Sequence, residues 1–216
     1  MTYYVKEMFY SLQGEGVNSG KPALFCRFSG CNLWDGKFET RNSAQTSCRF
    51  CDTDFSGTDG ENGGIFDSPE ELLGKALDVI RSAAIASQQL PMIVFTGGEP
   101  LLQLDEALVR KTRDRGFYIA VETNGTIAAP AGIDWLAVSP KTGCKLVQRS
   151  GNELKLVFPQ PDINPDDFLK YDFENFCLQP CDNESVKQNT VICTDYCLQN
   201  PIWRLSIQTH KLLNIK

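Results

Sequence analysis

The sequence predicts an α/β fold, an incomplete (β/α) barrel with mostly parallel strands. Short apolar runs alternate with amphipathic segments and short loops, which is the pattern of a parallel sheet. A complete eight-fold barrel takes about 250 residues, whereas this chain has 216 and its first 65 are largely non-helical. Four polar motifs, TGGEP, ETNG, SPK and QPCD, follow strand candidates. Because ligands bind at the carboxyl ends of parallel strands, we expect these motifs near the site.

The expected elements follow one another along the chain. A strand over 23–30 leads directly into Cys31. A helix is expected to start at Ser68, with Pro69 in its first turn and Glu71 three residues after the cap, in a segment that runs to residue 89. Further strands are expected over 92–98, 117–125, 134–141, 153–158, 176–180 and 203–210, and helices over about 104–115 and 184–199.

Composition narrows the class of protein. With 42% hydrophobic and 22% charged residues, we expect one compact domain over residues 1–216. The net charge is −6 and no block of basic residues is present, so we expect no direct nucleic-acid partner. No signal-peptide core and no apolar run of roughly 20 residues is found, so no membrane contact is expected. Nine cysteines without a secretion signal predict reduced thiols and a cytoplasmic location.

Three cysteines, Cys31, Cys48 and Cys51, lie within one short stretch. The pair Cys48-x-x-Cys51 alone fits structural zinc, a redox dithiol or an iron–sulfur cluster. Adding Cys31 favours a [4Fe–4S] cluster, because three thiolates leave one iron open to a ligand that is not protein. No histidine lies near them, since the only one is His210.

The motif FTGGEP at 95–100 suits such a ligand. Its glycines let backbone approach closely, and the carboxylate of Glu99 accepts hydrogen bonds from an ammonium group. An amino acid that chelates iron through its amine and carboxylate would need such a loop beside it.

These features together resemble radical S-adenosylmethionine (SAM) enzymes: three cysteines ending in C-x-x-C, Phe50 before the last of them, and a GGEP strand end. The usual spacing in those enzymes is C-x3-C-x2-C, and here it is C-x16-C-x2-C, so the cluster-binding loop at 31–51 is enlarged. The longer loop costs only about 1–1.5 kcal/mol more to close. That is small beside the roughly 10–16 kcal/mol with which a thiolate site holds even zinc.

Four further motifs resemble the 7-carboxy-7-deazaguanine synthase family of the queuosine precursor pathway. They are SLQGEG at 11–16, CRFSGCNLW at 26–34, CDTDF at 51–55 and LSIQTHK at 205–211. The resemblance covers nearly the whole chain and implies three cofactors: a [4Fe–4S] cluster, SAM and Mg2+. It implies that Cys31, Cys48 and Cys51 hold the cluster. It implies no catalytic residue beyond the cluster and the SAM radical.

The resemblance also implies the remaining site residues. The residues implied to bind SAM are Phe50, Cys51, Asp52, Gly98, Glu99, Ser139, Pro140, Lys141, Gln179, Pro180, Cys181 and Asp182. Thr53 is implied to bind magnesium, and its hydroxyl oxygen suits a hard cation. The residues implied to bind the substrate are Leu12, Gln13, Gly14, Glu15, Arg27, Thr96, His210 and Lys216. The family often ends in proline, so Lys216 occupies that place without matching it.

The implied activity is that of a carbon–nitrogen lyase. A 5′-deoxyadenosyl radical abstracts hydrogen from C6 of 6-carboxy-5,6,7,8-tetrahydropterin, the ring contracts, ammonia leaves and SAM is regenerated. The product is 7-carboxy-7-deazaguanine. Arg27 suits the substrate carboxylate because a guanidinium grips a carboxylate with two hydrogen bonds. A homodimer and an electron donor such as flavodoxin or ferredoxin are also implied.

Two alternatives remain at this point. One is a radical SAM activase of a glycyl-radical enzyme, which would need an open face for a protein loop. The other is a zinc-binding interaction module that uses the same three cysteines and one more thiol. The remaining cysteines, Cys26, Cys144, Cys177, Cys193 and Cys197, are expected as small buried hydrophobic side chains, and Cys181 is expected near the nucleoside through its backbone.

Overall fold

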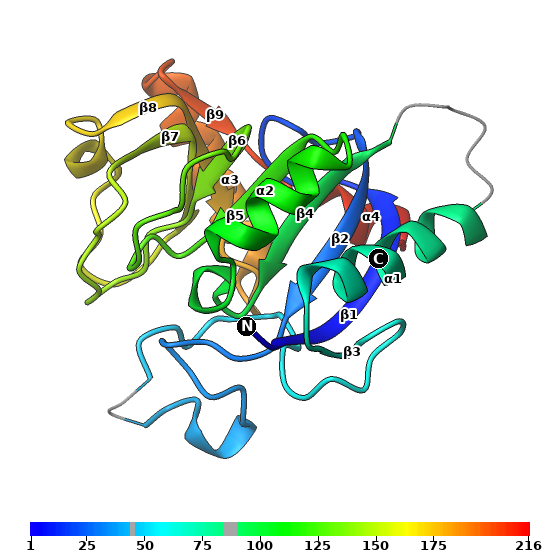
Figure 1. Ribbon diagram of the computed structural model, residues 1–216. Helices are drawn as coiled ribbons and strands as arrows, with labels where there is room; N and C mark the ends of the chain where they lie inside the picture. Colours follow the sequence, from blue (N-terminus) through cyan, green and yellow to red (C-terminus); the bar gives the residue numbers. More distant parts are fainter. Residues whose placement is uncertain (44–45, 84–89) are drawn as a thin grey trace.

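The strands of the protein form one mixed sheet (Figure 1), seen in a computed structural model that describes residues 1–43, 46–83 and 90–216. Within these residues the strand order is β3-β1-β2-β4-β5-β6-β7-β8-β9. The strands are β1 (Tyr3–Leu12), β2 (Pro22–Phe28), β3 (Gly64–Phe66), β4 (Met92–Gly97), β5 (Ile119–Thr123), β6 (Trp135–Val138), β7 (Ser150–Phe158), β8 (Asp172–Pro180) and β9 (Trp203–Leu205). Strand β1 pairs antiparallel with β2 and β3, and every pairing from β2 to β9 is parallel.

The helices are α1 (Pro69–Ser82), α2 (Glu106–Asp114), α3 (Val186–Gln199) and the short α4 (Thr209–Leu213), with 3-10 turns η1 (Phe38–Thr40), η2 (Pro100–Leu102) and η3 (Pro165–Phe168). The expected helix start is confirmed, because the hydroxyl of Ser68 accepts a hydrogen bond from the Glu71 amide at 3.2 Å. Residues 84–89 of that expected segment lie outside the described residues. None of the described helices is both long and apolar enough to span a bilayer.

The predicted α/β fold with mostly parallel strands is confirmed. Helix α2 connects β4 to β5, but the β5–β6 and β6–β7 connections contain no helix and the β7–β8 connection contains only η3. The two edge strands, β3 and β9, do not pair with each other. The sheet therefore does not close into a complete barrel, and the described residues form fewer helices than a complete (β/α) barrel has, as the chain length suggested.

Several strand boundaries differ from the sequence-based expectation. Strand β1 was not expected, although its Tyr3 and Val5 are fully buried while Tyr4 is exposed, as in a half-buried strand. Strands β7 and β8 begin earlier than expected, because they pair along their whole length from Ser150–Asp172 onward. The expected strand over 203–210 is wrong beyond residue 205, because the chain turns there and enters α4.

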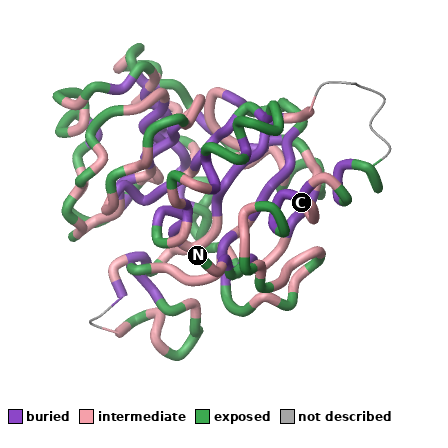
Figure 2. Tube along the Cα trace, in the orientation of Figure 1, coloured by how far each residue is buried: buried purple, intermediate pink, exposed green. Residues whose placement is uncertain are grey.

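The sheet has two apolar faces of different size. In β2, Leu24, Cys26 and Phe28 face the large core beneath the helices, whereas Ala23 and Phe25 face a smaller cluster on the other side. This alternation follows from the period of two in a strand. Figure 2 shows the buried residues concentrated in the central strands, with more exposed chain around them. The smaller cluster covers little of its face, which leaves room there for polar groups.

The cysteines outside the cluster motif divide into two groups. Cys26, Cys177 and Cys193 are buried, as expected. Cys144 is only partly buried and lies in neither apolar cluster, so the expectation is wrong for it. Cys197 is also partly buried, but it packs against the large core as a small hydrophobic side chain. Cys144 lies in the loop between β6 and β7, and Cys197 lies in the last turn of α3, where one side of the helix faces solvent.

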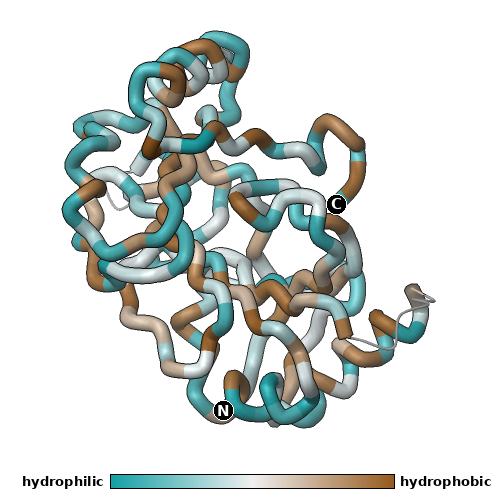
Figure 3. Tube along the Cα trace, turned by 90° about the horizontal axis from the view of Figure 1, so that it is seen from above, coloured by the Kyte–Doolittle hydropathy of each residue, from teal (hydrophilic) through white to brown (hydrophobic). Residues whose placement is uncertain are grey.

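The C-terminal segment returns to the N-terminal strand. The hydroxyl of Ser11 in β1 donates to the carbonyl oxygen of Lys216 at 2.7 Å. Apolar side chains on the same segment stay exposed, among them Leu212 and Leu213, and Figure 3 shows this apolar end of the chain beside the more polar loops. The chain end therefore lies beside the strand that leads into SLQGEG.

Candidate active site

A cavity of about 370 Å³ lies at the carboxyl ends of the parallel strands. It gathers segments that are far apart in the sequence, and most of the residues that the sequence assigned to the site line it. Those residues are Leu12, Gln13, Gly14, Glu15, Arg27, Cys31, Cys48, Phe50, Cys51, Asp52, Thr53, Thr96, Gly98, Ser139, Lys141, Gln179, Pro180, Asp182, His210 and Lys216. Pro140, Glu99 and Cys181 do not line the cavity.

Glu99 is fully buried and its carboxylate is occupied by the protein itself. One oxygen accepts from the Leu101 amide at 3.0 Å and from the Thr123 hydroxyl at 2.8 Å, and the other accepts from the Asn124 amide at 2.8 Å. Burial raises the pKa of Glu99 despite these hydrogen bonds. Glu99 therefore ties the end of β4 to the end of β5.

The GGEP glycines allow the chain to pack closely around Cys31. A side chain at Gly98 would overlap the carbonyl oxygen of Gly30 and would lie 2.8 Å from the β carbon of Cys31. The Glu99 amide also donates to the Gly30 carbonyl oxygen at 3.0 Å. The motif therefore fixes the position of the first cysteine.

The three cysteines face the same cavity and their thiols are free. A hydrogen bond from the Cys48 thiol lowers the pKa of Cys51 to about 6, whereas that hydrogen bond and burial raise the pKa of Cys48. A lowered pKa favours the thiolate, which is the form that binds metal. Three neighbouring thiols, one of them easily ionised, fit the donor set of an iron–sulfur cluster. No group of three or more His, Cys, Asp or Glu side chains suited to a single metal ion occurs among the described residues.

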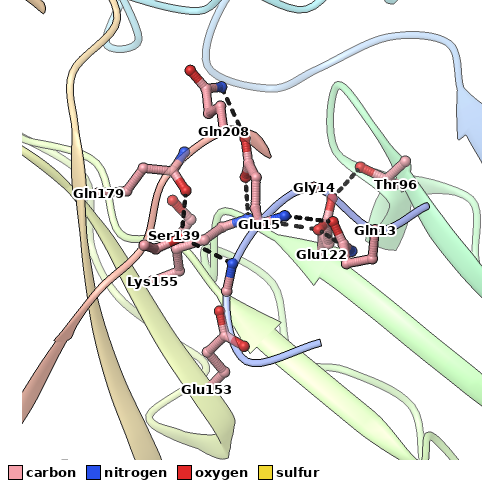
Figure 4. Close-up of polar contacts among 12 residues, drawn as sticks. Gln13, Gly14, Glu15, Thr96, Glu122, Ser139, Glu153, Lys155, Gln179 and Gln208 are labelled. Carbon is pink, nitrogen blue, oxygen red and sulfur yellow. Dashed lines mark hydrogen bonds and ion pairs between the residues drawn. The ribbon is translucent and has the colours of Figure 1, made fainter. Parts of the chain in front are cut away.

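A buried ion-pair network forms one wall of the cavity (Figure 4). The ammonium group of Lys155 contacts Glu15 directly and lies 3.6 Å from a carboxylate oxygen of Glu122. Burial alone would lower the pKa of Lys155, but the carboxylates of Glu122, Glu15 and Glu153 outweigh it and raise that pKa. Burial would likewise raise the pKa of Glu15, yet the charge of Lys155 lowers it to about 2. Lys155 and Glu15 are therefore both charged at neutral pH.

Hydrogen bonds extend this network across the cavity. Glu122 accepts from the Gln13 side chain at 3.1 Å and from the Thr96 hydroxyl at 3.0 Å. Gln208 donates to Glu15 at 2.8 Å and to Asp52 at 3.1 Å. The N-terminal loop, the ends of β4 and β5, and the C-terminal segment are thus linked through side chains.

The loop at Gly14 is held by the C-terminal segment. The Thr209 amide donates to the Gly14 carbonyl oxygen at 2.9 Å. The imidazole of His210 packs directly on Gly14, so any side chain there would overlap its ring. The SLQGEG motif therefore needs glycine at position 14. Gly14 and His210 both line the cavity.

On the side of the cavity assigned to SAM, Lys211 contacts two carboxylates. Its ammonium group pairs with Asp52, which follows the last cysteine, and with Asp182 of the QPCD motif. Nearby, the ammonium group of Lys141 donates to Ser139 at 2.6 Å and lies 5.9 Å from the ring centre of Phe50. Burial lowers the pKa of Lys141. Basic side chains thus surround the segment between Phe50 and Asp52.

Arg27 extends from β2 onto the small apolar cluster. Its Nε donates to Glu7 at 3.0 Å, and its guanidinium lies 5.8 Å from the ring centre of Phe9. Phe9 stacks on Phe25 with ring centres 5.1 Å apart. Lys216 joins the same group, with its ammonium group 3.3 Å from Glu7. Two cations and an aromatic pair therefore form one part of the cavity wall.

Several residues that line the cavity were given no role from the sequence, among them Glu122, Lys155, Gln208 and Lys211. Glu122 and Lys211 stand inside motifs already noted, ETNG and LSIQTHK. Lys155 interrupts the apolar strand run ELKLVF, and a charged residue between two buried leucines is a usable signal. Gln208 carries no signal beyond its place in the QTHK motif.

The fold and the site define the class of protein. A family model described as the Radical SAM superfamily matches residues 43–155, just over half of the chain and including Cys48 and Cys51. The chain is a radical SAM protein, as its cysteine motif and strand-end loops predicted.

Comparison with full-length proteins narrows the class further. The chain is 54% identical over 220 residues to 7-carboxy-7-deazaguanine synthase of Caulobacter vibrioides, and 53% identical over 215 residues to that of Burkholderia multivorans, with 100% of each chain covered. The crystal structure of QueE from Escherichia coli is similar with a TM-score of 0.65 at 29% identity, covering 96% of this chain and 94% of that one. This chain belongs to the 7-carboxy-7-deazaguanine synthase family.

The pairing of Glu15 with Lys155 predicts a stability change at acid pH. Because the pKa of Glu15 is lowered to about 2, its contribution is complete above the unfolded pKa near 4.5 and is lost as pH falls toward 2. We expect Glu15→Gln to be less stable than the wild type at pH 7, by up to roughly 3 kcal/mol. The difference should shrink steadily below pH 4.5, measured by urea unfolding of the protein without cofactors. A difference that is independent of pH between 7 and 3 would contradict the pairing.

Proposed function

We propose that this protein is a radical SAM lyase that converts 6-carboxy-5,6,7,8-tetrahydropterin to 7-carboxy-7-deazaguanine with loss of ammonia, in queuosine and 7-deazapurine biosynthesis. The observation that carries the proposal is the identity of 54% over complete chains to proteins named 7-carboxy-7-deazaguanine synthase. The cavity supports it, because it combines three cysteines, cation-rich walls and an aromatic pair within about 370 Å³. The glycyl-radical activase and the zinc module have no comparable support.

Cys31, Cys48 and Cys51 would hold the [4Fe–4S] cluster through their thiolates. When bound, the cluster and SAM would supply the 5′-deoxyadenosyl radical that starts the rearrangement. The protein's own part is to orient the substrate and to keep the cavity dry. Buried Leu33 and Phe55, which line the cavity beside the cysteines, serve the second purpose.

The SAM-binding segments would be Phe50–Asp52, Gly98–Glu99, Ser139–Lys141 and Gln179–Asp182. Support comes from their shared edge of the sheet, at the ends of β4, β6 and β8 and beside the cluster loop. Glu99 and Cys181 would hold these segments in place. Glu99 joins β4 to β5, and the Cys181 amide donates to the Phe158 carbonyl oxygen at 2.8 Å.

The pterin would lie between the network of Lys155 and the wall formed by Arg27. Arg27 would bind the substrate carboxylate, while Glu122 and Gln13 would hold the polar edge of the ring. Leu12, Gly14, Glu15, Thr96, His210 and Lys216 would complete the pocket. Support comes from the charges, because a carboxylate is stabilised by the cations on one wall and ring N–H groups by the carboxylates on the other.

Thr53 would bind Mg2+ together with the substrate, since a magnesium ion keeps several waters and takes few protein ligands. Thr53 lines the cavity next to Cys51, which supports this role. We also propose a homodimer, a cytoplasmic location and a flavodoxin or ferredoxin as the electron donor.

The cluster assignment predicts the effect of removing each thiol. Replacing Cys31, Cys48 or Cys51 with alanine should abolish the visible absorbance of the reconstituted cluster and the formation of 5′-deoxyadenosine from SAM, because three thiolates are the full protein ligand set. Cys197→Ala, in the last turn of α3 and outside the cavity, is the control and should bind the cluster as wild type does. Retention of SAM cleavage in any of the three variants would remove that cysteine from the cluster.

The substrate assignment predicts that Arg27→Ala weakens pterin binding about 30-fold, because one charge-assisted interaction of roughly 2 kcal/mol is lost. SAM binding should change less than about twofold. Both affinities are measured by calorimetry on cluster-loaded protein without reductant. Arg27→Lys keeps the charge without the forked geometry and should fall between. Equal losses for both ligands would instead assign Arg27 a structural role through Glu7.

A further inference from the structure

In the enlarged loop between Cys31 and Cys48, the side chain of Arg41 contacts the backbone at Cys51. Arg41 lies just after the turn η1, and its Nη1 donates to the carbonyl oxygen of Arg49 at 3.1 Å and to that of Cys51 at 2.9 Å. These two carbonyl groups lie on either side of Phe50. One guanidinium nitrogen therefore bridges the backbone of the turn that carries the last cysteine.

The guanidinium is also fixed from its other side. It lies over the indole ring of Trp34, 4.4 Å from the ring centre, in a cation–π arrangement. Trp34 is buried and packs edge-to-face on Phe55 with ring centres 5.7 Å apart. Its indole N–H donates to the Lys37 carbonyl oxygen at 3.2 Å. The stacking surface for Arg41 is thus itself anchored to the wall of the cavity.

The Nε of Arg41 is buried and has no hydrogen-bond partner among the described residues. An unpaired buried donor costs about 1–3 kcal/mol. A flexible surface arginine would avoid this cost by turning toward water. The other contacts of the side chain must therefore outweigh it, which indicates that Arg41 is held in place by the loop.

Backbone contacts shape the inserted loop so that Arg41 reaches the turn. The Arg41 amide donates to the Phe38 carbonyl oxygen at 3.2 Å, and the Thr46 hydroxyl donates to the Thr40 carbonyl oxygen at 2.8 Å. The Ser47 amide donates to the Leu33 carbonyl oxygen at 3.0 Å, which joins the two ends of the insertion. In Figure 1 the part of the insertion that carries η1 lies outside the sheet.

We propose that Arg41 is a positioning residue that holds the Cys48–Cys51 turn in its cluster-binding conformation and places a fixed positive charge beside it. This inference rests on the proposed function, because it presumes that the turn binds an iron–sulfur cluster. It assigns a role to the insertion: the longer loop supplies a second layer of support around the thiolates. Such supporting contacts tune both metal retention and reduction potential.

The test compares Arg41→Gln and Arg41→Lys with Lys37→Gln. Lys37 lies in the same insertion, is exposed, and loses the same charge, so Lys37→Gln is the matched control. Iron release to a chelator under anaerobic conditions is followed in each reconstituted protein, and the midpoint potential of the cluster is measured. Circular dichroism melting of each protein without cluster reports its folding.

We expect Arg41→Gln to lose iron about tenfold faster than wild type, which is the scale of other supporting contacts around metal ligands. Its potential should fall, because a positive charge near the cluster favours the reduced, more negative state. Arg41→Lys should lose iron at an intermediate rate with a smaller change in potential. Lys37→Gln should match wild type in both, because solvent and salt screen an exposed charge.

Three results would overturn the inference. One is iron release and potential in Arg41→Gln that equal those of Lys37→Gln. Another is a melting temperature lowered by about 10 °C or more in both Arg41 variants, which would make Arg41 a general stabiliser of the domain. The third is a wild-type protein that retains no cluster, and this result alone would also overturn the proposed function.

Discussion

The site depends on the ion pairs that the buried ammonium group of Lys155 forms with Glu15 and Glu122. The ammonium group contacts Glu15 of the N-terminal loop and lies 3.6 Å from Glu122 of β5, and Lys155 itself belongs to β7, so these pairs join three segments. The charge of Glu153, two residues away on β7, also favours the ammonium form. A buried charge without partners is strongly destabilising, whereas a fully paired one is tolerated. The cavity wall can therefore form only when all three segments are in place. Because Glu153 also accepts from the Val17 amide at 3.0 Å, the network holds the backbone of the N-terminal loop as well as its side chains.

Three segments outside the parallel strands complete what the incomplete barrel leaves open. The SLQGEG loop, the C-terminal segment and Leu33 and Trp34 of the insertion between Cys31 and Cys48 all line the cavity. Their contacts are mutual: Thr209 binds the Gly14 carbonyl, and Lys211 contacts Asp52. These segments therefore add to the cavity wall that the ends of the parallel strands begin.

The sequence predicted the fold class and the membership of the cavity well, because both depend on local signals. Strand runs ending in glycine or polar motifs identify the sheet edge, and C-x-x-C with a third cysteine identifies the metal-binding loop. The function of individual side chains was harder to predict. The hydrogen bonds of Glu99 to Thr123 and Asn124 could not be predicted, because these partners lie more than twenty residues away and meet it only in the folded protein. Lys155 and Arg41 were missed for the same reason, since their partners are set by tertiary contacts.

An anaerobic turnover assay shows whether this cavity converts a carboxytetrahydropterin. Cluster-reconstituted protein is incubated without oxygen with SAM, Mg2+, a strong reductant and 6-carboxy-5,6,7,8-tetrahydropterin, and the products are identified by mass spectrometry. Because the assigned reaction releases ammonia, we expect a new species that is lighter than the substrate by the mass of one ammonia. A protein shown to carry its full cluster that forms 5′-deoxyadenosine but no such species would contradict the assigned substrate. If it formed neither, the assigned reaction itself would be wrong.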